Sequence, residues 1–94
     1  MEFISFKSVN DFHKIQNSLQ IGQELSIVYL GGTKSFFIIT QNGIADFHNL
    51  NGPAYDNGDG YLEYCIYGKY LGINLTNEEF EKRKNQYLKE LTFQ

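Results

Sequence analysis

The spacing of apolar positions along this chain changes from helical to strand-like and back to helical. Residues 3–6 are a short apolar run that is compatible with a first strand. Apolar residues then recur at spacings of three and four, at Val9, Phe12, Ile15 and Leu19. This period follows a capping-box pattern at Ser8 and Asp11, and it predicts an amphipathic helix over about residues 9–20.

The central segment has the composition and alternation that are typical of strands. Such runs cover residues 24–30, 35–40 and 44–48. A Gly-Gly-Thr-Lys turn at residues 31–34 separates the first two runs. Asn42 and Gly43, the strongest two-residue turn signal in the chain, separate the second from the third. These features predict an antiparallel meander.

Residues 49–60 are rich in Asn, Asp and Gly and indicate turns. Within this segment, residues 53–55 are compatible with a short strand, because Pro53 at its first position needs no hydrogen-bond partner in the sheet. Residues 61–67 alternate again, and Gly68-Lys69 turns the chain into Tyr70-Leu71. We therefore expect a further strand and a tight turn.

The last segment predicts a helix from residue 77 to about 91. Thr76 and Glu79 form a capping box, and the apolar stripe consists of Phe80, Tyr87, Leu88 and Leu91. With 94 residues there is room for one domain over residues 1–94. The predicted fold class is α+β, with a small antiparallel β-sheet meander, an N-terminal helix and a C-terminal helix.

Composition narrows the function classes. The net charge of −3 argues against nucleic-acid binding by phosphate neutralisation, which needs a dominant basic face. Cys65 is the single cysteine, so no internal disulfide forms and a reducing compartment is expected. No apolar run approaches the length of a membrane span, and no signal peptide is evident at the start. We expect a soluble protein of the cytoplasm, or of the host cytoplasm if it is phage-encoded, without a membrane partner.

The second half resembles a known repeat. The residues that carry the resemblance are 47–55, Asp59-Gly60, Glu63-Tyr64, residues 66–69 and the helix opening at 76–80. Together they resemble one unit of the MORN-like repeats of phage and bacterial proteins. The resemblance implies a β-hairpin unit, followed by a helix up to residue 91, that serves as an interaction scaffold without fixed chemistry. The chain departs from the pattern by having one unit, Asn51 in place of the usual acid, and no Trp.

The candidate metal, catalytic and phosphate-binding residues have simpler structural roles. His13, His48 and Cys65 lie in separate elements without the local spacing of a metal site or a thiol enzyme. Asp56 and Asp59 have the oxygen density of a calcium loop, but the twelfth position is Tyr67 instead of Glu. The segment 31–34 lacks the helix that must follow a phosphate-binding loop. No metal, cofactor or enzyme activity is predicted.

The tyrosines are the strongest candidates for binding. Five of them lie close together in the sequence, at Tyr55, Tyr61, Tyr64, Tyr67 and Tyr70. They are too many for a small core to bury with every hydroxyl paired, although cross-strand pairs that merely cover a sheet are an equal alternative. With Lys69, they are the predicted protein- or ligand-binding residues.

Two functions fit these residues. The first is a non-catalytic, phage- or mobile-element-encoded protein that binds and inhibits or modulates a host defence protein. The second is a protein that sequesters a nucleotide or small anion between stacked tyrosines and Lys69 or Lys34. Pairing of an exposed strand edge into a homodimer is also expected.

Overall fold

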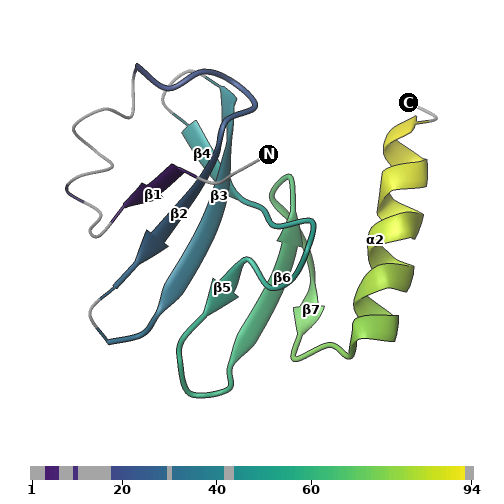
Figure 1. Cartoon of the computed structure of the whole chain (residues 1–94). Coiled ribbons are helices and arrows are strands. Elements are labelled where there is room, and N and C mark those ends of the chain that lie inside the picture. The colour runs from purple at the N-terminus through teal and green to yellow at the C-terminus, as the bar shows by residue number, and fades with distance from the viewer. Residues whose placement is uncertain (1–3, 7–9, 11–17, 30, 42–43, 93–94) are drawn as a thin grey trace.

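The computed structural model describes residues 4–6, 10, 18–29, 31–41 and 44–92, and within them the chain is mainly β. One seven-stranded sheet is accompanied by one described α-helix (Figure 1). The strands are β1 (Ile4–Phe6), β2 (Glu24–Val28), β3 (Lys34–Gln41), β4 (Ile44–Phe47), β5 (Tyr55–Asp56), β6 (Leu62–Ile66) and β7 (Lys69–Ile73). The helix is α2 (Asn77–Thr92).

The long strand β3 joins the two halves of the sheet. The strand order is β1-β2-β3-β5-β6-β7, and β4 also pairs with β3. β4 pairs with the second half of β3, from Phe37 to Gln41, whereas β5 pairs with Lys34 and Ser35 at its beginning. One edge of β3 therefore holds two short strands in turn, and Figure 1 shows the β6–β7 hairpin and α2 beyond them.

The predicted α+β class with two helices is wrong, because strand pairing dominates the described chain. β1 pairs with β2 in parallel, so the sheet is not a simple antiparallel meander. A parallel pair cannot be joined by a tight turn, and residues 7–23 separate these two strands in the sequence. Most of the helix expected over about residues 9–20 lies outside the described residues. Of its described residues, Asn10 is helical, whereas residues 18–20 are not α-helical, and Leu19 packs into the core of the sheet.

The other strand predictions were confirmed in position. The turn at 31–34 does join β2 to β3, and β3 pairs with β4 in antiparallel fashion, although residues 42 and 43 between them lie outside the described residues. The short strand expected at 53–55 is β5, shifted to Tyr55–Asp56. The strand expected at 61–67 is β6, and the turn that follows it is centred on Tyr67 and Gly68.

Two apolar clusters lie on opposite faces of the sheet. Leu19, Leu25, Ile27 and Ile39 form the first, over β2 and β3. The second lies between α2 and the β6–β7 hairpin and is formed by Tyr64, Ile66, Leu71 and Phe80. The register places Ile27, Ser35, Tyr55 and Glu63 in one cross-strand row. Successive side chains in a strand point to opposite faces, so Tyr64 lies on the face away from that row.

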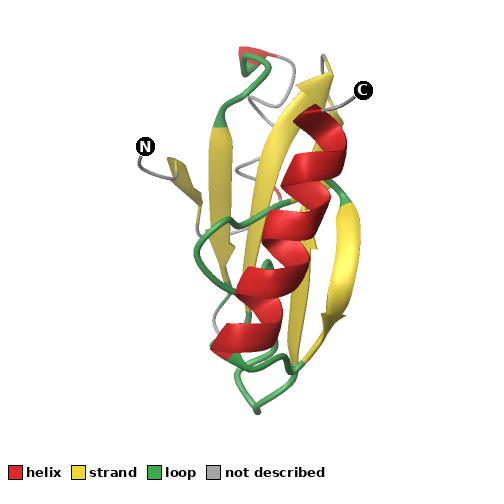
Figure 2. Cartoon of the chain, turned by 90° about the vertical axis from the view of Figure 1, so that its right-hand side faces the viewer, coloured by secondary structure: helices red, strands yellow, loops and turns green. Residues whose placement is uncertain are grey.

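The helix α2 starts where its capping box predicts. The Glu79 backbone N–H donates to Thr76 Oγ1 at 3.1 Å, and the Thr76 backbone N–H donates to Glu79 Oε1 at 3.0 Å. Both bonds satisfy N–H groups that have no partner within the helix. In Figure 2 the helix lies in front of the sheet, with its axis roughly parallel to the strands. Its apolar stripe therefore covers one face of the hairpin, and the described part of the chain places no helix on the opposite face.

Candidate functional site

The predicted binding residues divide between the two faces of the β6–β7 hairpin. Tyr61 precedes β6, and Glu63 and Cys65 follow it on the same face at strand period. Tyr70 pairs with Cys65, and Tyr55 pairs with Glu63, so both tyrosines belong to this face. The structure therefore brings three of the five predicted tyrosines together.

Two of these tyrosines, Tyr55 and Tyr61, continue a row of aromatic rings that begins on β3. The ring of Phe37 lies 4.7 Å from that of Phe47, measured between centroids. Phe47 meets Tyr55 edge-on at 6.4 Å, and Tyr55 meets Tyr61 edge-on at 6.2 Å. Edge-to-face contacts at these distances are favourable because the positive ring edge meets the negative ring face.

Much of the sheet face that carries this row is exposed. The exposed fractions are 37% for Phe47, 36% for Tyr61, 51% for Tyr70 and 44% for Ile73, which pairs with Glu63 from β7. We call the group of Phe47, Tyr55, Tyr61, Tyr70 and Ile73, with Glu63 at its centre, the aromatic surface. It occupies the face of the hairpin that α2 does not cover.

A short hydrogen bond fixes the centre of the aromatic surface. Tyr61 Oη donates to Glu63 Oε1 at 2.6 Å. This bond, with smaller contributions from desolvation and the negative charge of Glu63, raises the pKa of the Tyr61 hydroxyl to about 12. Tyr61 therefore stays neutral at physiological pH, and its ring is held beside the carboxylate.

Two of the predicted tyrosines have structural roles instead. Tyr64 is buried under α2, where its ring lies 4.9 Å from that of Phe80 and its hydroxyl donates to the Leu75 carbonyl oxygen at 3.3 Å. Tyr67 occupies the β6–β7 turn with a φ of 50°, next to Gly68 with a φ of 80°. Positive φ at both central positions is the geometry of a type I′ hairpin turn. Neither side chain belongs to the aromatic surface.

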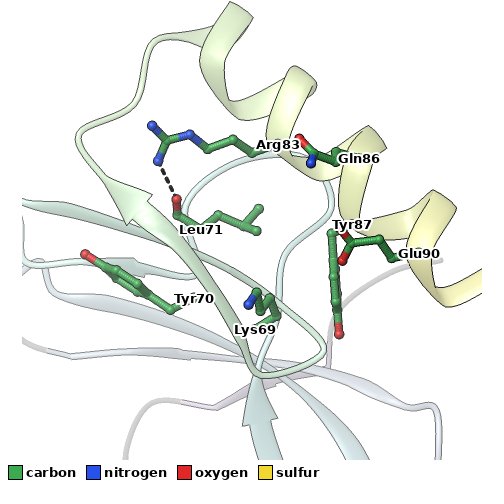
Figure 3. Close-up of a pocket in the computed structure, with 7 residues that line it drawn as sticks. All are labelled: Lys69, Tyr70, Leu71, Arg83, Gln86, Tyr87 and Glu90. Atoms are coloured by element: carbon green, nitrogen blue, oxygen red, sulfur yellow. Dashed lines mark hydrogen bonds between the residues drawn. The ribbon is translucent and has the colours of Figure 1, made fainter.

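Lys69 lies on the opposite side of the hairpin, in a groove between β7 and α2. The groove has a volume of about 230 Å³ and is lined by Lys69, Tyr70, Leu71, Arg83, Gln86, Tyr87 and Glu90. In Figure 3, Tyr70 points away from the helix, whereas Lys69, Arg83 and Tyr87 lie between strand and helix. Tyr55 and Tyr61 therefore lie on the opposite face of the hairpin from Lys69, and the sandwich of tyrosines with a lysine stays a prediction.

Arg83 holds an irregular stretch of β7. Leu71 is the extra residue of a β-bulge, and Arg83 Nη1 donates to its carbonyl oxygen at 2.6 Å. A side chain on Gly72, whose φ is 153°, would come within 2.7 Å of Arg83 Nη1. β7 ends the strand order. Bulges on such an edge hinder pairing with another sheet, so this geometry disfavours the expected dimer contact, and the homodimer stays a prediction.

His48 is completely buried at the junction between the two halves of the sheet. Its Nδ1 accepts a hydrogen bond from the Tyr67 backbone N–H at 2.9 Å, and its ring lies 4.3 Å from the Tyr67 ring. Nε2 lies 3.7 Å from Glu24 Oε1 and is otherwise without a partner among the described residues. Burial lowers the pKa of the imidazole, and Glu24 offsets part of this change. His48 therefore joins β2 to the β6–β7 turn.

The remaining candidates show no arrangement for chemistry. Cys65 is buried, and burial, together with the charge of Glu63, raises the pKa of its thiol, so a nucleophilic thiolate is disfavoured. His13 lies outside the described residues. Asp56 Oδ1 accepts the Gly58 backbone N–H at 2.8 Å, as expected of a turn. Within the described part of the chain no three His, Cys, Asp or Glu side chains are grouped for a metal ion.

Sequence reasoning missed three members of the aromatic surface: Phe47, Glu63 and Ile73. The signal for Glu63 was present, since Tyr61, Glu63 and Cys65 alternate with the apolar positions that α2 covers. Phe47 and Ile73 become neighbours of the tyrosines only through pairing between β3 and β4 and along β3, β5, β6 and β7. That register is not readable from a single sequence.

Comparison with protein-family models, with curated proteins and with solved structures gave no match. The resemblance to a MORN-like unit therefore stays a prediction. No helix in the described ranges has both the length and the apolar character needed to cross a bilayer.

Proposed function

We propose that this chain is a small, non-catalytic binding protein that attaches to a partner protein through the aromatic surface and inhibits or modulates that partner. The observation that supports this most strongly is the exposure of Tyr61, Tyr70 and Ile73 on a sheet face that α2 does not cover. Tyrosine is favoured at protein interfaces because it offers a large, stiff contact area and a polar hydroxyl.

The row of ring contacts strengthens the proposal. Tyr61 is held by Tyr55 on one side and by Glu63 on the other, so it loses little conformational freedom on binding. Binding costs less when the contact residues are already ordered. Protein hot spots have this character, with a few rigid aromatic side chains near the centre of the contact.

The biological setting is also a proposal. Phage or mobile-element origin, and a host defence protein as the partner, rest on two features. One is the resemblance to MORN-like units, and the other is the predominance of Lys, which accounts for seven of the eight basic residues. The nucleotide-sequestering alternative is less well supported. Glu63 places a negative charge among the tyrosines. Lys34 is the register partner of Asp56, so it lies on the sheet face opposite to that of Tyr55.

An affinity pull-down from a bacterial lysate tests the proposal. The wild-type chain is expected to retain a stoichiometric protein, and a Tyr61→Ala/Tyr70→Ala variant is expected to lose it. Truncation of hot-spot residues typically costs about 2 kcal/mol or more each, which is about 30-fold in affinity. An Ile21→Ala/Leu91→Ala variant is the matched control, because it removes two exposed apolar side chains elsewhere.

Mass spectrometry of both proteins and small molecules reads the outcome. Loss of the partner from the tyrosine variant but not from the control supports the proposal. Equal recovery by both variants would show that the aromatic surface is not the contact. A nucleotide that copurifies without any protein, visible as absorbance at 260 nm, would favour the sequestering function instead.

A further inference from the structure

Glu63 lies in an unusual environment for a carboxylate. It is half-buried in the middle of a sheet face, with Tyr55 opposite on β5, Ile73 opposite on β7 and Tyr61 bonded to it. Tyr70 is the fourth neighbour: it pairs with Cys65 and so lies diagonally across from Glu63. The carboxylate therefore stands among three tyrosines and one aliphatic side chain.

No positive charge within the described residues compensates Glu63. Neither described ion pair includes it: one joins Lys84 to Glu81, and the other is the contact between His48 and Glu24. Lys69 of β7 and Arg83 of α2 line the groove on the helix side of β7, as Figure 3 shows. A half-buried carboxylate is favoured by an opposite charge, and the described residues do not supply one there.

The tyrosine rings also favour a cation. The face of each ring is negative, so a cation above it is attracted, and the attraction grows when a carboxylate lies beside the ring. Tyr55 and Tyr61 meet at an interplanar angle of 74°, so they present differently directed ring surfaces beside Glu63. Aromatic rings that surround a carboxylate are the composition of cation-binding cages.

We propose that the centre of the aromatic surface receives an arginine side chain of the partner protein, with its guanidinium stacked on the tyrosine rings and bonded to Glu63. Arginine fits better than lysine because its planar group stacks on aromatic faces and bonds a carboxylate through two N–H groups. Glu63 Oε2 accepts no hydrogen bond from the described residues and is available for one of them. This inference rests on the proposed function and names the chemistry of the partner.

The test needs no identified partner. The intact chain, with 13C-labelled tyrosine rings, is titrated with N-acetyl-arginine amide and separately with N-acetyl-citrulline amide, its neutral isostere. The ring signals of Tyr55, Tyr61 and Tyr70 are expected to shift saturably with the arginine compound. Those of Tyr29 and Tyr87, outside the aromatic surface, are expected to stay in place. Citrulline is expected to bind at least about fivefold more weakly, because the cation supplies the attraction.

A Glu63→Gln variant separates the carboxylate from the rings. Gln retains an oxygen that can accept the Tyr61 hydroxyl, so the local structure is preserved while the charge is removed. Arginine binding is expected to weaken about fivefold, and citrulline binding to stay unchanged. Equal shifts with both compounds, or no saturable shift, would overturn the arginine site. Such a failure would leave the pull-down result intact, because a partner can bind the aromatic surface through other side chains.

Discussion

Replacing Phe80 by alanine is expected to lower the free energy of unfolding by about 3–5 kcal/mol. Phe80 is 4% exposed and packs against Tyr64 at the centre of the cluster under α2. The substitution removes the ring and leaves a cavity between helix and hairpin. Because small domains have a total stability of about 5–15 kcal/mol, much of the fold's stability is at stake. Urea denaturation followed by circular dichroism measures the change.

Leu91→Ala is the matched control for Phe80→Ala. Leu91 belongs to the same helix and the predicted apolar stripe, but it is 37% exposed near the C-terminal end. Its truncation is expected to cost less than about 1 kcal/mol. If both variants lose equal stability, or if Phe80→Ala is neutral, α2 does not stabilise the hairpin in the way its packing indicates.

Stability is expected to fall as the pH drops below about 6.5, because of His48. Its pKa is lower in the folded chain, where burial disfavours the charged ring, than in the unfolded chain. The unfolded state therefore binds the proton first, and each pH unit between the two pKa values costs up to about 1.4 kcal/mol. The loss is absent above the unfolded pKa and complete below the folded one. Urea denaturation at a series of pH values measures it.

A His48→Asn variant isolates this contribution. The amide oxygen of Asn can accept the Tyr67 backbone N–H in place of Nδ1, and the side chain does not titrate. Its stability is expected to be lower at pH 7, because the larger ring is lost, but flat between pH 7 and the pH at which carboxyl groups begin to titrate. An unchanged slope in the variant would mean that another group causes the pH dependence.

The elements that the sequence predicted well are those with local signals. The helix α2 has its cap and its apolar stripe within one segment, and the cap bonds are present, as is the packing of Phe80, Tyr87 and Leu88 against the hairpin. The β2–β3 and β6–β7 hairpins follow from glycine turns that lie between adjacent runs. In each case the contacts that decide the structure join residues close in sequence.

The features that the sequence did not predict depend on distant pairing. The parallel contact of β1 with β2, and the sharing of one β3 edge by β4 and β5, join segments that carry no matching local pattern. The same limit applies to the candidate site. Composition identified a surplus of tyrosines, but only the register assigns Tyr64 to the core and groups Tyr55, Tyr61 and Tyr70 around Glu63.

Site-specific photocrosslinking in bacterial cells tests the central claim most directly. The photoreactive residue p-benzoylphenylalanine replaces Tyr61 in one variant and Leu91 in another; Leu91 is equally exposed but lies on α2. The aromatic surface predicts a defined protein adduct from position 61 and none from position 91. An adduct from position 91 alone, or equal adducts from both positions, would contradict the assignment of the aromatic surface as the binding site.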